Sequence, residues 1–206
     1  ISPRGDVHGL WISKNYGTSW TELVAPTIPL FPWQDAHGPT ITGKAASFTG
    51  VAVSFNGLIM WAVGASRTYI GRSSKYLYKS IDGGTSWVSI ATSGFAGRVA
   101  CSRDSSTVVY GGSNGVFVSM DGGDNFIEDT PSLVDANGQK RSPNSISISD
   151  DGLKIVFCSD ATHLFIAVVT STYNWQSGLT WVSLTDTNMD ELVNLNPNIG
   201  GNVRNM

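Results

Sequence analysis

Two stretches of the sequence concentrate side chains that could bind a sugar. Residues 25–42 hold four of the eight prolines together with an aromatic, an acidic and an imidazole side chain, and residues 65–74 add two arginines and a tyrosine. Aromatic rings stack on apolar sugar faces, while carboxylates and guanidinium groups hydrogen-bond to hydroxyl or carboxylate groups. The predicted ligand-binding residues are Trp33, Asp35, His37, Arg67, Tyr69 and Arg72. The alternative is that these Pro and Trp side chains only cover one end of the fold.

Carboxyl groups with the spacing needed for hydrolysis are not evident. Glycoside hydrolysis uses two carboxyl groups about 5–10 Å apart. Asp35, Glu128, Asp129 and Asp135 lie in loop-like segments, but no spacing selects two of them. We therefore predict no catalytic residues, and the sequence favours a non-catalytic function over an enzymatic one.

The remaining reactive side chains indicate no metal site and no cofactor. The histidines His8, His37 and His163 are too far apart in the sequence for the usual spacing of metal ligands. Cys101 and Cys158 are the only cysteines, and both are predicted to be small core residues. The net charge of −3 gives no basic surface for nucleic acid. No apolar run approaches the ~20 residues of a transmembrane helix, so no membrane insertion is expected.

An eight-residue segment recurs along the chain and predicts the elements that would position such residues. It reads Ser-x-Asp-Gly-Gly-x-x-aromatic at 80–87 and 119–126, and residues 13–20 are a looser copy with Asn15 in place of Asp. A fourth, more divergent copy ends at Trp181. Each copy lies between short apolar runs, which is typical of a β-hairpin turn. The predicted turn residues are Ser13, Asn15, Gly17, Trp20, Ser80, Asp82, Gly84, Trp87, Ser119, Asp121, Gly123, Phe126, Gly178 and Trp181.

These segments resemble the Asp-box, or BNR, repeat of sialidases, xyloglucanases, sortilin-type receptors and other β-propellers. The resemblance implies an all-β propeller of four-stranded antiparallel blades, with each box between the third and fourth strands. In those families the box is scaffold, so it does not identify a function. The Arg-Ile-Pro motif expected near the start of a sialidase is absent, because residues 2–6 read Ser-Pro-Arg-Gly-Asp.

A second internal alignment predicts the inner strands of the blades. Segments 51–57, 99–105 and 146–152 align as a first strand followed by a turn, each alternating apolar with small or polar residues. In the strands that follow, Trp61, Tyr110 and Phe157 are expected to share one register. That alignment also places Cys101 with Val53 and Ile148, and Cys158 with Ala62 and Gly111.

The spacing of the repeats predicts one propeller domain over residues 1–206. Its parts are the outer strands of blade 1 at 9–24, blade 2 at 43–91, blade 3 at 97–129, blade 4 at 144–185, and closing strands at 190–206. If residues 190–206 complete blade 1, two strands from each end of the chain close a four-bladed ring. Otherwise the chain is an arc of a larger propeller, and the sequence leaves both alternatives open.

The function that best fits these features is a non-catalytic interaction module. It would bind carbohydrate or form a structural unit of an extracellular or particle-surface assembly, with a glycan or protein as its partner. A homo-oligomer or a part of a larger assembly is compatible with this interpretation, and the family resemblance implies an extracellular or secreted protein. The alternative is a fragment of a sialidase- or xyloglucanase-like glycoside hydrolase, whose active site is completed by missing blades or by a partner.

Overall fold

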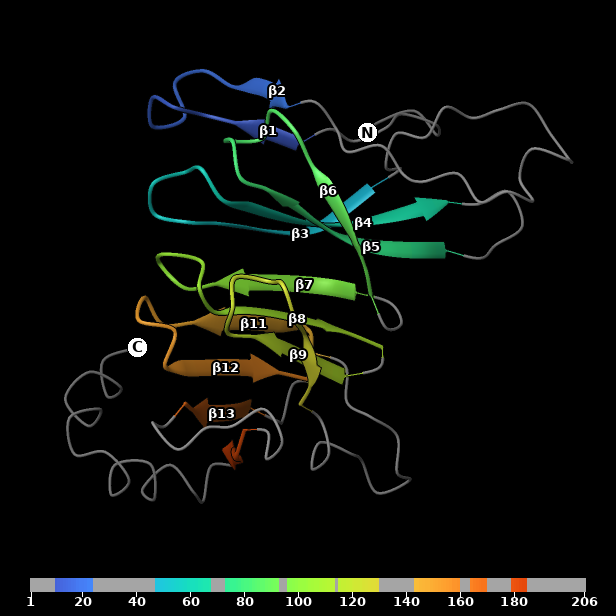
Figure 1. Cartoon of the computed structure of the whole chain (residues 1–206), viewed down its shortest axis with the longest axis vertical. Helices are drawn as coiled ribbons and strands as arrows, with labels where there is room; N and C mark the ends of the chain where they lie inside the picture. The colour runs from blue at the N-terminus through green and yellow to red at the C-terminus, as the bar shows by residue number, and fades with distance from the viewer. Residues whose placement is uncertain are drawn as a thin grey trace, which may run out of the picture.

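Every regular element of the described residues is a β-strand (Figure 1). The computed structural model describes residues 10–23, 47–67, 73–92, 96–113, 115–129, 143–159, 164–169 and 179–184. The strands are β1 (Leu10–Ile12), β2 (Thr21–Leu23), β3 (Ser47–Val53), β4 (Met60–Arg67), β5 (Ser73–Ser80), β6 (Val88–Ala91), β7 (Ala96–Cys101), β8 (Val108–Gly112), β9 (Gly115–Ser119), β10 (Ile127–Glu128), β11 (Ser145–Ile148), β12 (Lys154–Cys158), β13 (Leu164–Val168) and β14 (Trp181–Leu184). The expected all-β class is therefore confirmed.

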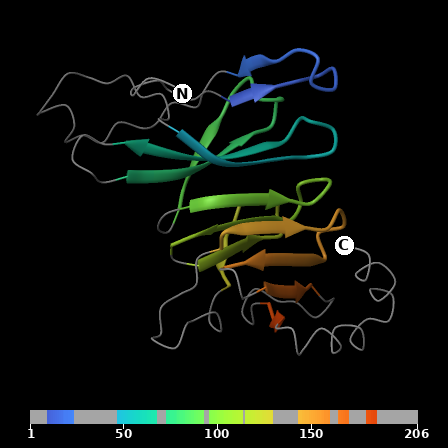
Figure 2. The same cartoon turned by 180° about the vertical axis from the view of Figure 1, so that it is seen from behind.

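The strands form four antiparallel sheets that follow one another in chain order. The first sheet pairs β1 with β2, and the second, third and fourth sheets contain β3–β6, β7–β10 and β11–β14, each strand beside its neighbour in sequence. The sheets lie one after another along the long axis of the molecule in both views (Figures 1 and 2). Consecutive four-stranded meanders of this kind are consistent with the blades of a β-propeller.

Apolar side chains fill the space between neighbouring sheets. Because successive residues of a strand point to opposite faces, one strand contributes to two cores. In β4, Ala62 joins the cluster shared with Leu10 of the first sheet, whereas Trp61 joins the cluster shared with Val108 of the third sheet. All five residues of β8 are buried, since sheets lie on both of its faces.

The predicted register of the second strands is wrong by one residue at Trp61. Val53 pairs with Met60, Cys101 with Val108 and Ile148 with Ile155. Counting from these pairs, Ala62 is the equivalent of Tyr110 and Phe157, whereas Trp61 precedes that position. By the same count, Cys158 and Gly111 are equivalent to Val63, whereas the sequence alignment matches them with Ala62.

The turns that precede these strands explain the error. All three have the same length, and the backbone N–H of Ser54, Ser102 or Ser149 donates to the carbonyl five residues later at 2.9 Å. An alignment that matches Trp61 with Tyr110 and Phe157 requires turns of unequal length, which the structure does not have. In the observed register the Trp61 side chain faces the third sheet, whereas Tyr110 and Phe157 each face the sheet that precedes their own.

Both cysteines are free thiols of intermediate burial. Cys101 packs against the core between the second and third sheets, and burial raises the pKa of its thiol. Within the described part of the chain, no helix is long and apolar enough to cross a bilayer. The same residues contain no group of three His, Cys, Asp or Glu side chains that could hold a metal ion. The predicted closing strands at 190–206 lie outside the described residues.

Candidate functional site

Ser80 and Asp82 form the centre of the turn that joins β5 to β6. The Ser80 hydroxyl donates to Asp82 Oδ1 at 2.8 Å and accepts the backbone N–H of Gly84 at 2.9 Å. Asp82 Oδ1 also accepts the backbone N–H of Ser86 at 2.9 Å. Gly84 has φ +88°, a conformation that glycine adopts without a steric cost. The polar atoms that recur in the copies of this segment are therefore engaged within the turn itself.

The two other copies of the segment make the same bonds. The Ser119 hydroxyl donates to Asp121 Oδ1 at 2.7 Å and accepts the N–H of Gly123 at 2.8 Å. Asn15 replaces the aspartate without loss of the turn, because its Oδ1 accepts the Ser13 hydroxyl at 3.0 Å and the Ser19 N–H at 2.9 Å. Of the fourth copy, Gly178 lies outside the described residues.

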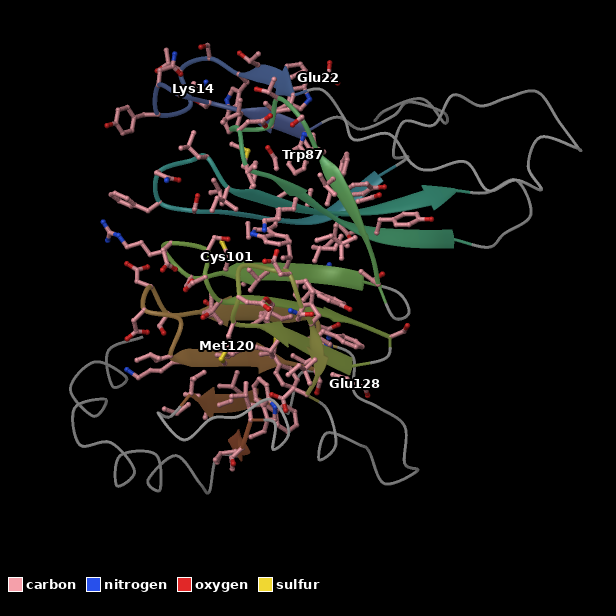
Figure 3. All side chains as sticks on the ribbon, in the orientation of Figure 1. Lys14, Glu22, Trp87, Cys101, Met120 and Glu128 are labelled. Carbon is pink, nitrogen blue, oxygen red and sulfur yellow. The ribbon has the colours of Figure 1, made fainter. Side chains whose placement is uncertain are left out.

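The aromatic residue that closes the second, third and fourth copies packs toward the preceding sheet, whereas Trp20 of the first copy is exposed. Trp87 packs between the first and second sheets (Figure 3), and its Nε1–H donates to the Gly84 carbonyl at 3.1 Å. Phe126 contacts Trp61 of the second sheet edge to face at 6.3 Å between ring centroids, and the Nε1–H of Trp181 donates at 3.0 Å to the carbonyl of Asp129, which follows the last strand of the third sheet. These copies therefore join neighbouring sheets as well as neighbouring strands.

A second set of polar turns, between the first and second strands of each four-stranded sheet, is not recognised from the sequence. The Ser102 hydroxyl donates to Asp104 Oδ1 at 2.8 Å and accepts the Thr107 N–H at 3.0 Å, while Asp104 Oδ1 accepts the Ser106 N–H at 2.9 Å. Ser54 with Asn56 and Ser149 with Asp151 repeat this arrangement. A Ser-x-Asn/Asp pattern in the three aligned segments was the available signal. We refer to these as the inner turns.

The inner turns of successive sheets are hydrogen-bonded to one another. The N–H of Phe55 donates to the Arg103 carbonyl at 2.8 Å, and the N–H of Arg103 donates to the Asp150 carbonyl at 2.9 Å. The Arg103 guanidinium also stacks on the Phe55 ring at 3.7 Å and pairs with the Asp150 carboxylate at 3.5 Å. The inner turns lie together on the left of Figure 1. Hydrogen-bonded polar groups therefore extend across this end of the sheets, which we call the turn end.

Hydrogen bonds in these turns lower the pKa of Asp151 and of three further carboxyl groups, which reach about 2. The Ser86 hydroxyl and N–H and the Ser80 hydroxyl lower the pKa of Asp82 to about 2. The Ser106 N–H and the hydroxyls of Ser102 and Ser106 do the same for Asp104, whose pKa is also about 2. At Asp121 partial burial acts to raise the pKa, but bonds from Asn125, Ser119 and Asp124 outweigh it and lower the value to about 2.

We expect the free energy of unfolding to decrease as the pH falls from about 4 to about 2. Asp82, Asp104 and Asp121 have folded-state pKa values of about 2, below the value near 3.9 of an unfolded chain. The folded state therefore binds fewer protons, and the stabilisation is complete above pH 4 and lost as the pH falls through 2. Denaturant titrations at several pH values measure this slope. The triple Asp→Asn variant should flatten it, and an unchanged slope in that variant would contradict the assignment.

Arg98 is a charged, exposed side chain at the other end of the described sheets. The first strands of the second and third sheets each begin there with a bulge, at Phe48/Gly50 and Ala96/Arg98. The Arg98 Nη1 donates to the carbonyls of Thr49 at 3.3 Å and Gly97 at 2.8 Å, and its Nε donates to the carbonyl of Asn144 at 2.6 Å. By the observed register, these three carbonyls occupy equivalent positions on three successive first strands.

The charge of Arg98 is fixed in place but not neutralised by the described residues. It is anchored by neutral carbonyls, no carboxylate of the described ranges forms an ion pair with it, and its side chain is exposed. Its Nη2 group donates to no described residue. With Nε and Nη1 engaged, the two diverging N–H groups of Nη2 remain, and each can donate one charge-assisted hydrogen bond to a carboxylate, phosphate or sugar hydroxyl oxygen. No sequence pattern distinguished Arg98 from the other arginines.

Two of the candidate carboxylates, Glu128 and Asp129, lie at the end of β10. Figure 3 labels Glu128, which lies on the side away from the inner turns. Asp129 is only 1% exposed, and both of its carboxylate oxygens lie 2.8 Å from the N–H of Leu179. Its backbone carbonyl accepts the Nε1–H of Trp181 at 3.0 Å. Burial raises the pKa of the Asp129 carboxyl, against the effect of these hydrogen bonds. Asp129 thus connects the third sheet to the start of β14 through a buried carboxylate.

Most of the predicted ligand-binding residues belong to stretches outside the described part of the chain. Trp33, Asp35, His37, Tyr69 and Arg72 lie outside the described residues, as does the candidate carboxylate Asp135. Arg67 is the last residue of β4, where its backbone pairs with Ser73. Ser47, the first residue of β3, pairs with Ala65 near that same end of the sheet. The described strand ends that flank the two predicted ligand-binding stretches therefore lie at the Arg98 end.

Comparison with known proteins supports the fold and leaves the function open. No family model matches the chain, and no curated protein matches it. An ancestral GH74 enzyme is similar in structure, with a TM-score of 0.51 and 18% identity over 86% of this chain and 23% of that enzyme. The chain therefore spans less than a quarter of that enzyme, and a likeness at this identity concerns the fold alone.

Two further solved structures are similar to parts of the chain. A nidogen/laminin complex matches with a TM-score of 0.44 and 14% identity over 68% of this chain and 48% of that one. A GH74 enzyme of Niastella koreensis matches with a TM-score of 0.26 and 11% identity over 82% of this chain and 36% of that one.

Proposed function

We propose that this chain is a propeller module that binds a glycan or a protein partner without catalysing a reaction. In this proposal the Ser-x-Asp turns are Asp-box turns, and they are scaffold. One observation supports it most directly: the polar groups of the turns bond to one another, whereas at the opposite end no carboxylate of the described residues pairs with Arg98. Ligand binding is therefore assigned to the Arg98 end.

The chemistry of Arg98 favours a ligand with an acidic group or adjacent hydroxyls. Its Nε and Nη1 are occupied by backbone carbonyls, so Nη2 is the part that would contact a ligand. The predicted residues Trp33, Asp35, His37, Tyr69 and Arg72 belong to stretches that connect to the strands at this end, and they would add aromatic and polar contacts. An extracellular or secreted location and assembly into a larger complex belong to the same proposal.

A glycoside hydrolase fragment is the second candidate, favoured by the structural likeness to an ancestral GH74 enzyme. It would need two carboxyl groups at the ligand. Asp129 is unsuited to that role, because its carboxylate is buried against the Leu179 backbone. Missing blades or a partner would have to supply the site.

A glycan array and a panel of chromogenic glycosides distinguish the two candidates. The interaction module predicts binding to a subset of glycans, or to a protein partner, with no release of chromophore. Turnover of any glycoside by the purified chain would refute the non-catalytic proposal. If the chain bound neither glycans nor glycosides, carbohydrate would be excluded as its ligand, and the proposal would be restricted to a protein partner.

Arg98→Gln should weaken binding of an acidic glycan by about tenfold or more, because a charge-assisted hydrogen bond contributes about 1.5–3 kcal/mol. Arg103→Gln is the matched control, since it removes the same charge at the turn end. Calorimetric titration of each variant with the best ligand from the array measures the effect, and circular dichroism verifies folding. Equal weakening in both variants would show that net charge, and not the Arg98 position, determines affinity.

A further inference from the structure

The far face of the fourth sheet lacks a neighbour among the described residues. We call the side of a sheet that points to the preceding sheet its near face, and the opposite side its far face. In the third sheet both faces are covered, and every residue of β8 and β9 is buried. In β12 and β13 only alternate residues are buried, and these face the third sheet. On the far face Leu164 is 37% exposed, although its equivalents Leu77 and Val116 are 0% exposed.

The near face of the first sheet is uncovered at the other end of the row. Trp11, Tyr78 and Phe117 each lie two residues before the serine that begins a copy of the repeated segment. Tyr78 is 0% and Phe117 is 5% exposed, whereas Trp11 is 55% exposed. Trp20, which closes the first copy, is 59% exposed, whereas Trp87 packs against the core shared with the first sheet. The first sheet therefore presents two tryptophans that no described residue covers.

The glycine four residues after each of these serines gives independent evidence for a missing neighbour. A Cβ on Gly84 would lie 2.8 Å from Leu23 Cδ1 of the first sheet, and a Cβ on Gly123 would overlap the Trp61 ring of the second sheet. A Cβ on Gly17 would meet no atom within 4 Å. The three glycines have similar φ values of +83°, +88° and +92°, so the first turn has the same shape as the two that fit against a preceding sheet.

We propose that the near face of the first sheet docks on the far face of the fourth sheet of a second molecule of this chain. Each of the three interfaces within the chain joins the far face of one sheet to the near face of the next. The two uncovered faces are one of each kind, so together they would repeat this interface. In both views the first and fourth sheets lie at opposite ends of the row (Figures 1 and 2), so the two faces do not meet within one molecule.

The interface between the second and third sheets specifies the expected contacts. There, the near-face residue Phe117 shares a core with far-face residues of the second sheet, namely Trp61, Val63 and Leu77. By register, the equivalents of these three residues in the fourth sheet are Val156, Cys158 and Leu164. Trp11 of one molecule is therefore expected to pack on these three residues of the other.

A two-stranded sheet is sufficient for an interface of this kind. The first sheet contains only β1 and β2, yet Leu10 on its far face is 8% exposed and Tyr78, which shares that core, is 0% exposed. Because only two strands would dock, we expect a weak, concentration-dependent association, as is usual for interfaces that bury less than about 1,200 Å². The inference extends the assembly named in the proposed function, rests on that part of it alone, and needs no ligand.

Sedimentation velocity of the full chain at several concentrations tests the docking. The unaltered chain should form species of two or more molecules, because a dimer joined by unlike faces keeps one free face of each kind. Trp11→Glu and Leu164→Glu each disrupt one face, so either variant alone should associate at least about tenfold more weakly. Mixed in equal amounts, they should form a 1:1 dimer and nothing larger, because each provides the face that the other lacks. Ile81→Glu is the matched control, since it adds the same charge at a side chain that is 68% exposed in a turn of the second sheet.

The other outcomes would overturn the inference. Association of Leu164→Glu alone would mean that two first sheets face each other, and association of Trp11→Glu alone would mean that two fourth sheets do. If the unaltered chain stayed monomeric and Trp11→Glu lost binding on the glycan array, the tryptophans would belong to a glycan site instead. Equal weakening by Ile81→Glu would assign the association to net charge. A negative glycan array has no effect on the sedimentation readout, so the two proposals fail separately.

Alkylation of the native thiols tests the same docking without substitutions, in case circular dichroism shows that the variants do not fold. Cys158 lies on the face that would be covered, and both it and Cys101 are free thiols of intermediate burial. In the unaltered chain, Cys158 should react several-fold more slowly at high protein concentration than at low concentration, while the rate at Cys101 stays constant. Peptide mapping measures both rates. A rate at Cys158 that does not depend on concentration would overturn the inference.

Discussion

Replacing Trp61 with alanine is expected to lower the free energy of unfolding by about 3–5 kcal/mol, the usual cost of truncating a buried aromatic residue. Trp61 is 1% exposed and belongs to the core between the second and third sheets. Its Nε1–H donates to the Ser105 hydroxyl at 2.8 Å, and its ring meets Phe126 edge to face. Alanine would leave a cavity between the sheets and a buried hydroxyl without its partner.

Denaturant unfolding of Trp61→Ala and Trp61→Phe separates the packing from the hydrogen bond. Phenylalanine keeps most of the ring volume but cannot donate to Ser105, so it should cost about 1–2 kcal/mol. Phe55→Ala is the control, since that ring is 74% exposed and should cost less than about 1 kcal/mol. If Trp61→Ala were no worse than Phe55→Ala, the two sheets would not depend on this contact.

The importance of Trp61 could not be derived from the sequence, although the fold could. The repeats predicted β-hairpins and sheets of four antiparallel strands, because alternating apolar residues and glycine turns are local signals. The side of the sheet that Trp61 faces depends on a one-residue register, and a one-residue slip moves every side chain to the other face. Aromatic matching gave the wrong register, whereas the Ser-x-Asn/Asp turns determine the correct one.

The arrangement of the candidate site could not be derived from the sequence either. Arg98 was not identified because its importance comes from three backbone carbonyls on three different sheets, and no sequence pattern encodes their convergence. Asp129 was considered as a possible ligand-side carboxylate because it lies in a loop-like segment, but its partner is the backbone N–H of Leu179, 50 residues away. Local turn chemistry is readable from sequence, whereas contacts between sheets require the structure.

Gly123→Ala is expected to destabilise the protein far more than the same change at Gly17. Both glycines occupy equivalent positions in Ser-x-Asp or Ser-x-Asn turns, with φ values of +92° and +83°. Alanine in this conformation costs about 1–2 kcal/mol at either site. A Cβ on Gly17 would meet no atom within 4 Å, whereas a Cβ on Gly123 would overlap the Trp61 ring. Overpacking adds about 1–3 kcal/mol, so Gly123→Ala should cost roughly 2–5 kcal/mol.

A double-mutant cycle identifies the source of this difference. Combined with Trp61→Phe, which removes part of the ring that Gly123 contacts, Gly123→Ala should cost about 1–3 kcal/mol less than it does alone. Gly17→Ala should combine additively with Trp61→Phe, because no contact joins the two positions. Additive behaviour at Gly123 as well would mean that backbone strain alone explains its glycine. Coupling at Gly123 only would establish that the turn is held against the preceding sheet through Trp61.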